Sequence, residues 1–280
     1  MATVLVFGGE GQLGSELARR DSDHVVSLTR READVTDVAA VRRALTEHHP
    51  ERVVNCAGWT KVDAAEELVA EATRVNVDGA RNVAAVCAEQ GIALCHVSTD
   101  YVFDGTATAP IPEDATPNPQ SAYGRTKLEG EIAVRAAHPG AHIVRTSWLY
   151  GMAGPNFVLT MLRKLEAGDE VRVVDDQHGT PTWTGHLAPA LLYLLEIAPP
   201  GTYHLSNSGA TTWFGFAAAI ASMIGAASPL PIATSEYPLR AVRPAYSVLD
   251  NSMWRGLGEA PLPDWRDGLR AYLQELRVPS

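Results

Sequence analysis

The sequence predicts an α/β protein, in which a parallel sheet carries helices on both of its faces. Short apolar runs of strand length alternate with helical patterns over residues 1–150, and a glycine-rich turn joins the first run to the first helix. Strands that alternate with helices form βαβ units with right-handed crossovers, and such units build parallel sheets. We therefore expect a doubly wound, Rossmann-type parallel sheet, followed by a smaller C-terminal α+β lobe.

The elements of the first half follow from the periodicity of the apolar residues. Helices are expected where apolar residues recur three and four positions apart, and buried strands where they form a short continuous run. Strands are predicted at 3–7, 25–28, 52–55, 93–97 and 142–145, and helices at 12–20, 37–48, 71–90 and 121–136.

The pattern is less regular after Trp148, where the lobe is predicted to begin. Proline-rich segments predict a break at 199–201 and a loop at 226–231, and Thr211 is the expected N-cap of one helix. The chain is thus predicted to have a first domain at residues 1–150, which residues at about 170–200 complete. Residues 151–280 form most of the lobe. In this second part a strand is predicted at 170–174 and helices at 155–166, 185–197, 212–224 and 265–276.

The composition excludes several classes of protein. With 46% hydrophobic and 20% charged residues, the chain of 280 residues is predicted to be soluble and globular. A net charge of -10 argues against partners that favour basic surfaces, so neither nucleic acid nor a membrane is expected. The first residues lack the basic region of a signal peptide, and no apolar run is long enough to cross a bilayer.

The cysteines and histidines give no sign of a disulfide framework or a metal site. Cys56, Cys87 and Cys95 form no C-x-x-C pair, and the nine histidines lack the spacing of zinc ligands. Unpaired thiols are typical of a reducing compartment. We therefore expect a cytoplasmic protein with buried thiols and no bound metal.

The turn after the first strand has the spacing of a dinucleotide-binding loop. Gly8, Gly11 and Gly14 stand three residues apart, with Gln12 and Leu13 between the last two. Glycines allow a tight turn and let backbone N–H groups approach a pyrophosphate at a helix N-terminus. These five residues are therefore predicted to bind a nicotinamide dinucleotide, and 1–150 is predicted to be the dinucleotide-binding domain.

The end of the second strand indicates which dinucleotide is bound. Enzymes that use NAD carry an acidic residue there for the ribose 2′-hydroxyl, whereas this chain has Thr29, Arg30 and Arg31. A guanidinium binds a 2′-phosphate by charge-assisted hydrogen bonds, so Arg30 predicts NADPH, with NADH kept as the alternative. Asp34 and Val35, a little later, are predicted to contact the adenine.

A tyrosine and a lysine four residues apart predict the chemistry. Tyr123 and Lys127 lie on one face of a predicted helix, and Thr99 follows the fourth strand at the edge where such sheets bind ligands. An ammonium nearby favours the phenolate and lowers the pKa of the phenol, which can then protonate the alkoxide that forms at a carbonyl oxygen. We predict that these three residues are catalytic and that Tyr123 and Lys127 also contact the cofactor.

Taken together, several motifs resemble the extended short-chain dehydrogenase/reductases, and within them the dTDP-4-dehydrorhamnose reductase family. They include Gly8-x-x-Gly11-x-x-Gly14, Ser98-Thr-Asp-Tyr-Val-Phe103 and Tyr123-Gly-x-Thr-Lys127. The resemblance continues through 145–148, 156–157, 176–182, 201–205 and 243–244, and so covers nearly the whole chain.

The resemblance implies an enzyme that reduces the C4 ketone of a dTDP-4-keto-6-deoxy-L-hexose, and it makes the C-terminal lobe the substrate lobe. It assigns the catalytic hydroxyl to Thr99 and substrate contacts to Thr99, Asp100, Trp148 and Arg243. It places Ala57, Gly58 and Trp59 along the cofactor. Trp213, in contrast, is predicted to pack within the lobe.

Two alternatives stay open at this point. One is a 4-ketoreductase of a modified deoxysugar in antibiotic glycoside biosynthesis, and the other is a non-catalytic regulatory subunit that binds NADP. Some members of the family bridge a homodimer with Mg²⁺ through glutamates. Glu16 matches one of these, but His186 stands where another carboxylate would be, so the metal is not carried over. A homodimer remains an open expectation.

Overall fold

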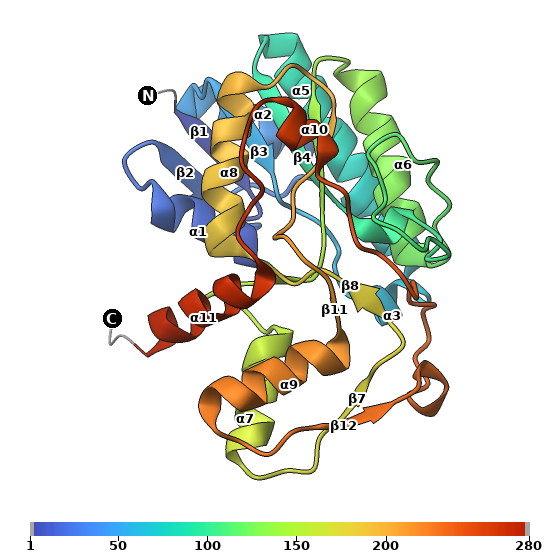
Figure 1. Cartoon of the computed structure of the whole chain (residues 1–280). Coiled ribbons are helices and arrows are strands. Elements are labelled where there is room, and N and C mark those ends of the chain that lie inside the picture. Colours follow the sequence, from blue (N-terminus) through green and yellow to red (C-terminus); the bar gives the residue numbers. More distant parts are fainter. Residues whose placement is uncertain (1–2, 278–280) are drawn as a thin grey trace.

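The computed structural model describes residues 3–277 and shows a six-stranded parallel sheet covered by helices on both faces (Figure 1). The order of the strands is β10-β5-β4-β3-β1-β2, and every neighbouring pair is parallel. The predicted fold class is therefore confirmed. The strands are β1 (Val4–Phe7), β2 (Val25–Leu28), β3 (Arg52–Asn55), β4 (Ala93–Thr99), β5 (His142–Thr146) and β10 (Thr202–His204).

Alternate residues of the strands pack against different helices, because successive side chains of a strand point to opposite faces. Leu5 and Phe7 of β1 belong to the core on one face, and Val4 and Val6 belong to the core on the other. Helices α2 (Val38–His48), α5 (Ala80–Gln90) and α6 (Ala122–Ala137) cover the first face, and α1 (Gln12–Arg20) and α8 (Thr184–Ile197) cover the second (Figure 1).

The predicted helix over 71–90 is wrong in its details. The segment contains α4 (Val69–Thr73), a π-helix (Arg74–Gly79) and then α5. The π-helix contains Asn76, which is buried and bonds to the backbone of Trp59 and the side chain of Thr126. Such π-bulges are often found at functional sites, and apolar periodicity does not reveal them.

The second half contains elements that the sequence analysis missed. Strand β10 and the short helix α10 (Ser252–Gly256) were not predicted, and the predicted loop over 226–231 runs into β12 (Leu230–Ile232). The N-cap of α9 (Trp213–Ile224) is Thr212 and not Thr211, because the side chain of Thr212 accepts the hydrogen bond from the Gly215 N–H.

The smaller lobe has its own apolar core beneath the sheet. This core joins α7 (Phe157–Glu166), α9 and α11 (Trp265–Leu276), with Trp265 fully buried among them (Figure 1). Pairs of short strands complete the lobe: β7 (Arg172–Val174) with β12, β6 (Leu149–Tyr150) with β9 (Thr182–Trp183), and β8 (His178–Gly179) with β11 (Thr211–Thr212).

The predicted division at residue 150 stays a prediction, and residues 1–2 and 278–280 at its outer ends lie outside the described residues. Strand β10, which comes from beyond that division, pairs with β5 in the large sheet. Among residues 3–277, no helix is both long and apolar enough to cross a membrane. The three cysteines are free, with Cys87 and Cys95 buried and Cys56 half-buried.

Candidate active site

The glycine turn is shaped to receive an anionic group. Gly8 has a φ of +88°, which side chains disfavour, and the N–H of Gly11 donates to the Gly8 carbonyl at 3.0 Å. A Cβ on Gly14 would lie 2.3 Å from that same carbonyl oxygen, so only glycine lets α1 pack this close to the turn. Gly11 is the N-cap of α1 and has no side chain to cap the helix, which leaves N-terminal N–H groups for a phosphate.

The first residue of α1 connects the turn to the smaller lobe. The Gln12 Nε2 atom donates to the carbonyl of Pro155, just before α7, at 3.3 Å. Its Oε1 atom is buried without a hydrogen-bond partner among the described residues, so it is available to a ligand with a donor. The side chain of Leu13, in contrast, packs in the core of the sheet, so a ligand could bind this residue only through its backbone.

The two residues predicted to recognise the adenosine end are bonded to each other. Arg30 Nε lies 3.0 Å from Asp34 Oδ2, and the Arg30 side chain is 64% exposed. The other oxygen of Asp34 accepts from the N–H and hydroxyl of Thr36. Val35 is buried, and its carbonyl accepts from Asn82. A phosphate at Arg30 would therefore meet a guanidinium that already has a carboxylate beside it.

The loop after β3 is held from two sides. Asn55 accepts from the Ala57 N–H at 3.1 Å, and Asn76 accepts from the Trp59 N–H at 2.8 Å. Between them, a Cβ on Gly58 would lie 3.8 Å from the Lys127 Nζ atom. The loop therefore presents bare backbone next to the lysine.

Thr99 and Tyr123 meet where β4 ends and α6 begins. Ser121 caps α6 by accepting from the Gly124 N–H at 3.1 Å, and this fixes the first turn that carries Tyr123. Burial raises the pKa of Tyr123 to about 12, and a hydrogen bond with the Thr99 side chain opposes that rise. The phenol is therefore protonated at neutral pH and can act as a proton donor.

Lys127 lies one turn further along α6. Its Nζ atom donates to the carbonyl of Val97 in β4 at 2.7 Å, and burial lowers its pKa to about 8. The expectation that Lys127 lowers the pKa of Tyr123 is not met: burial is the main influence on that phenol and raises its pKa, and Lys127 is not among the groups that shift it. The lysine nevertheless lies between the Gly58 loop and the strand that carries Thr99.

Asp100 is a second titratable group at this place. It is buried and accepts from the Thr99 hydroxyl at 3.0 Å, while its Oδ2 atom has no partner among the described residues. Burial raises its pKa to about 6, and the nearby hydroxyls of Ser247 and Thr99 oppose that rise. An unpaired buried oxygen beside the Thr99 hydroxyl is suited to accept from the hydroxyl of a ligand.

Arg243 is held by an aspartate that the sequence analysis did not identify. Arg243 Nη2 lies 2.6 Å from Asp63 Oδ2, and Asp63 also accepts from the Ala241 N–H at 3.0 Å. Burial raises the pKa of Tyr101, and the charge of Arg243 opposes that rise, so the guanidinium also lies near the ring that packs edge-on against Tyr123. The segment that carries Arg243 thus reaches the candidate site.

Trp148 lies just beyond the carboxyl end of β5, and Thr99 lies at the carboxyl end of the neighbouring strand β4. In the register of the two strands, Thr99 is opposite Thr146. The ring of Trp148 stacks on Trp213 with 3.6 Å between the centroids. Trp213, for which packing in the core or the lobe was predicted, packs in the lobe and also contacts a predicted substrate residue.

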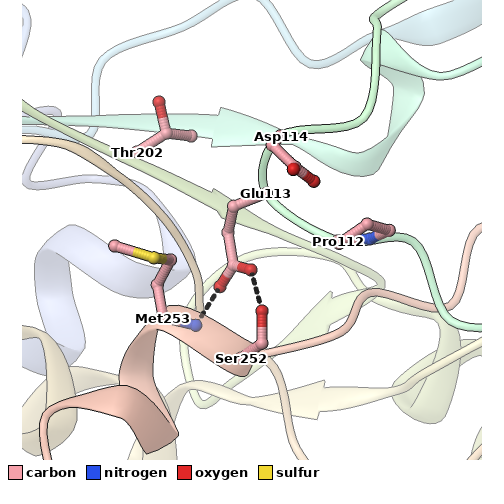
Figure 2. A pocket seen from close by; sticks show the side chains of 6 residues that line it. All are labelled: Pro112, Glu113, Asp114, Thr202, Ser252 and Met253. Atoms are coloured by element: carbon pink, nitrogen blue, oxygen red, sulfur yellow. Dashed lines mark hydrogen bonds between the residues drawn. The ribbon is translucent and has the colours of Figure 1, made fainter.

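None of these residues lines a pocket beside the edge strand β10. Figure 2 shows the six side chains that do line it. Its carboxylate, Glu113, accepts from the Ser252 hydroxyl and the Met253 N–H at the start of α10, and from the His204 N–H of β10. Both oxygens of Glu113 are occupied by these bonds, which indicates a structural role. The pocket is lined by Pro112, Glu113, Asp114, Thr202, Ser252 and Met253.

The residues present do not fit a magnesium site at Glu16. Its buried carboxylate bonds to Arg19 and Arg20, and both arginines also pair with Glu275. No group of three or more potential ligands among His, Cys, Asp and Glu was found within residues 3–277. Two guanidiniums therefore neutralise the carboxylates where the resemblance would have placed a cation.

Comparisons with known proteins show which family the chain resembles over nearly its whole length. The family described as RmlD substrate binding domain matches residues 1–278. A dTDP-4-dehydrorhamnose reductase of Streptomyces griseus is 46% identical over 95% of this chain and 91% of the relative. A probable dTDP-4,6-dihydroxy-2-methyloxan-3-one 4-ketoreductase of Streptomyces antibioticus is 43% identical over 97% of this chain and 95% of the relative. The crystal structure of dTDP-4-dehydrorhamnose reductase from Bacillus anthracis in complex with NADP is 37% identical, with a TM-score of 0.95 over 98% of this chain and 99% of that chain.

Proposed function

Because this chain belongs to the RmlD substrate-binding domain family, we propose that it is an NADPH-dependent reductase of a dTDP-4-keto-6-deoxy-L-hexose. The reaction reduces the ketone at C4 to an alcohol and yields dTDP-L-rhamnose or a related dTDP-deoxysugar. The curated relatives at 46% and 43% identity are both reductases of dTDP-sugars by name, which supports the substrate class.

One observation carries this proposal: Tyr123 packs against Tyr101, whose N–H donates to the Thr99 hydroxyl at the carboxyl end of β4, and Lys127 lies one turn further along α6. A protonated phenol at that position can donate its proton to the C4 oxygen as the alcohol forms. The Thr99 hydroxyl orients the phenol, and the Lys127 ammonium adds positive charge where negative charge develops on oxygen. Tyr123 then regains its proton from solvent.

The residues of the glycine turn fit a dinucleotide. A Cβ on Gly8 or Gly14 would meet backbone atoms within 3 Å, so only glycine fits at these two positions. The turn is therefore tight and carries no side chain there, which lets a ligand approach the backbone. Gly11, Gln12 and Leu13 start α1 and would hold the pyrophosphate, and Ala57, Gly58 and Trp59 would line the nicotinamide end with Lys127. When bound, NADPH supplies the hydride that reduces C4.

The substrate side is assigned to Thr99, Asp100, Trp148 and Arg243. The unpaired Oδ2 atom of Asp100 supports a contact with a sugar hydroxyl. Arg243 supports a contact with the diphosphate, although its pairing with Asp63 offsets part of its charge.

The direct test is an assay of NADPH oxidation with a panel of dTDP-4-keto sugars, followed by identification of the products by NMR. We expect oxidation that depends on the keto sugar and a product reduced at C4. NADPH binding without oxidation by any member of the panel would contradict the proposal and favour a non-catalytic regulatory subunit.

The choice of NADPH over NADH depends on Arg30. The Arg30→Ala variant should bind NADPH about tenfold or more weakly and leave NADH nearly unchanged, because a hydrogen bond to a charged group contributes about 1.5–3 kcal/mol. Isothermal titration with both dinucleotides measures this, and Arg31→Ala serves as the control. An equal loss for both cofactors, or no loss, would reject the 2′-phosphate contact.

A second candidate function is a 4-ketoreductase of a modified deoxysugar in antibiotic glycoside biosynthesis. The relative from Streptomyces antibioticus, at 43% identity, favours it. Both candidates use the same three catalytic residues and differ in the substituents of the sugar. The product panel separates them, because only one group of keto sugars should give a low KM.

The other expectations about partners stay predictions. A dTDP-sugar is the ligand that the family implies, while the homodimer and the cytoplasmic location are inferred from resemblance and composition. Sedimentation of the purified protein with and without NADPH would measure the oligomeric state directly.

A further inference from the structure

The backbone of Trp148 has an unfavourable conformation. Its φ is +48°, in the left-handed region that bulky side chains rarely adopt, and it is one of two such non-glycine residues between residues 3 and 277. Backbone strain of this kind persists only where the surrounding structure holds it in place, and it is often found at functional sites. The neighbours of Trp148 must therefore determine its position.

Trp213 covers one face of the Trp148 indole. The two rings are 3.6 Å apart and only 4° from parallel. Trp213 is the first residue of α9, whose N-cap Thr212 accepts from the Gly215 N–H at 2.9 Å and donates to Asp175. Phe157 packs against Trp213, with 4.7 Å between the ring centroids. Trp213 is thus itself held by a cap and by the aromatic core of the lobe.

Gly179 provides the space that the indole occupies. A Cβ on Gly179 would lie 2.3 Å from the Cε2 atom of Trp148 and 2.6 Å from its Nε1 atom. Gly179 belongs to β8, which pairs with Thr211 of β11 directly before α9. The same strand pair therefore brings both Gly179 and Trp213 to the indole.

We infer that Trp213 and Gly179 are positioning residues for the sugar nucleotide, because they fix the Trp148 ring at the edge of the sheet where Thr99 and Tyr123 meet. This inference rests on the proposed function, which makes Trp148 a substrate contact. The lobe would then control how the sugar fits, because α9 carries Trp213. Trp213 itself is not expected to touch the reacting atoms. Substitution of either residue should move the indole and weaken substrate binding without changing the proton donor.

The first test compares steady-state kinetics of Trp213→Ala and Trp213→Phe. We expect the alanine variant to raise KM for the keto sugar about three- to tenfold and to leave NADPH affinity unchanged. A change of this size corresponds to the interaction free energy of an aromatic pair. The phenylalanine variant should restore most of the loss because it keeps a stacked ring. Phe214→Ala, the adjacent aromatic residue on α9, is the matched control and should keep a normal KM.

The second test detects the stacked pair itself. Two stacked indoles couple their electronic transitions and give a positive and a negative band together in the circular dichroism spectrum. This couplet should disappear in Trp148→Ala and in Trp213→Ala but persist in Phe214→Ala. A couplet that survives removal of either tryptophan would overturn the assignment of the stack.

The third test uses Gly179→Ala, which should displace the indole and raise KM for the sugar with NADPH affinity unchanged. Trp148→Ala separates the failure of this inference from the failure of the proposed function. If Trp148→Ala raises KM while Trp213→Ala and Trp213→Phe do not, the positioning role is wrong and the substrate contact stands. If Trp148→Ala also leaves KM unchanged, the substrate contact itself is wrong.

Discussion

Burial decides which groups around Tyr123 carry a charge. It raises the pKa of Tyr123 to about 12 and of Asp100 to about 6, and it lowers the pKa of Lys127 to about 8. At neutral pH the phenol therefore keeps its proton, while the aspartate and the lysine are both mainly charged. The site therefore combines a neutral proton donor with one anionic and one cationic side chain.

Replacement of Tyr123 by phenylalanine should remove the proton donor alone. We expect turnover to fall by about 10²–10⁴-fold, the usual contribution of a positioned general acid, while NADPH affinity stays within a few-fold of the parent value. Steady-state kinetics and fluorescence titration with NADPH measure the two effects. Tyr150→Phe removes a buried phenol without a hydrogen-bond partner in the lobe and should leave turnover unchanged. Normal turnover in Tyr123→Phe would exclude the donor role.

Asp100 should make the protein less stable as the pH rises. Its pKa is raised in the folded state, so the folded protein binds the Asp100 proton more tightly than the unfolded chain does. This contribution to the free energy of unfolding is fully present below about pH 4 and is lost as the pH rises through about 6. The difference between about 6 and the ordinary pKa of 3.8 corresponds to about 3 kcal/mol. Asp100→Asn cannot ionise, so its stability relative to the parent protein should increase by up to that amount between pH 4 and 7.

Urea denaturation of the Asp100→Asn and parent proteins at a series of pH values measures this difference. Asp104→Asn is a suitable control, because Asp104 carries an exposed carboxylate near the same loop. A difference between Asp100→Asn and parent that does not change with pH would show that burial does not shift the Asp100 titration.

The residues whose spacing has a chemical meaning could be predicted from the sequence. Gly8 and Gly14 follow from a strand that turns into a helix, and Thr99 and Tyr123 follow from a strand end and a helix face. The partners of these residues could not be predicted in the same way. Asp63 meets its partner only because two segments 180 positions apart lie side by side. No periodicity carries that information.

At the scale of elements, α6 depends on its close contact with the π-helix. A Cβ on Gly130 would lie 2.2 Å from the Asn76 carbonyl oxygen, so the missing side chain lets the two helices touch. Asn76 in turn bonds to Thr126, between Tyr123 and Lys127. The separation of these two helices therefore sets where the proposed catalytic residues Tyr123 and Lys127 lie.

The Gly130→Ala substitution should separate α6 from the π-helix. Overpacking of this kind costs typically 1–3 kcal/mol, so we expect a lower melting temperature. Turnover should also fall, since an error of about 1 Å in the position of Tyr123 reduces the rate strongly. Calorimetry and kinetics on the same preparation test both effects. Gly256→Ala, on an exposed helix with no neighbour within 4 Å, should leave activity unchanged and stabilise slightly. A fully active, stable Gly130→Ala protein would contradict this role.

Helices and strands with a strong apolar pattern were predicted almost to the residue. The predicted limits 12–20, 25–28, 52–55 and 265–276 all agree with the structure. Strand β10 was missed because three residues are too few to show a pattern, and its pairing with β5 decides its conformation. The π-helix was missed because a one-residue insertion in a helix leaves the apolar content unchanged.

At the scale of the molecule, the sheet and the lobe are connected across the candidate site. Gln12 bonds to Pro155 next to the glycine turn, and Asp63 pairs with Arg243 near Tyr101. The segment around Arg243 is otherwise exposed, with Val242 59% and Tyr237 53% accessible. The Asp63 carboxylate is therefore a main anchor of this segment on the sheet.

Asp63→Ala should release that segment. We expect faster tryptic cleavage after Arg240 and a higher KM for the sugar nucleotide, because Arg243 loses the partner that orients it. Time-resolved proteolysis with mass spectrometry locates the cut. Glu89→Ala, which breaks the exposed ion pair with Arg42, should behave as the parent protein, because surface pairs contribute little. Unchanged cleavage in Asp63→Ala would show that other contacts hold the segment.

The late position of β10 in the chain has a consequence for biosynthesis. Five strands of the sheet leave the ribosome before residues 202–204 have been translated, and until then β5 has an open edge that other nascent chains could join. In the finished protein the edge strand is β10, which has only three residues. The N–H of His204 in this strand donates to the carboxylate of Glu113 and is not free to pair with another chain. The risk of aggregation is thus greatest for a polypeptide whose translation stalls shortly before residue 202, and it falls once β10 has docked.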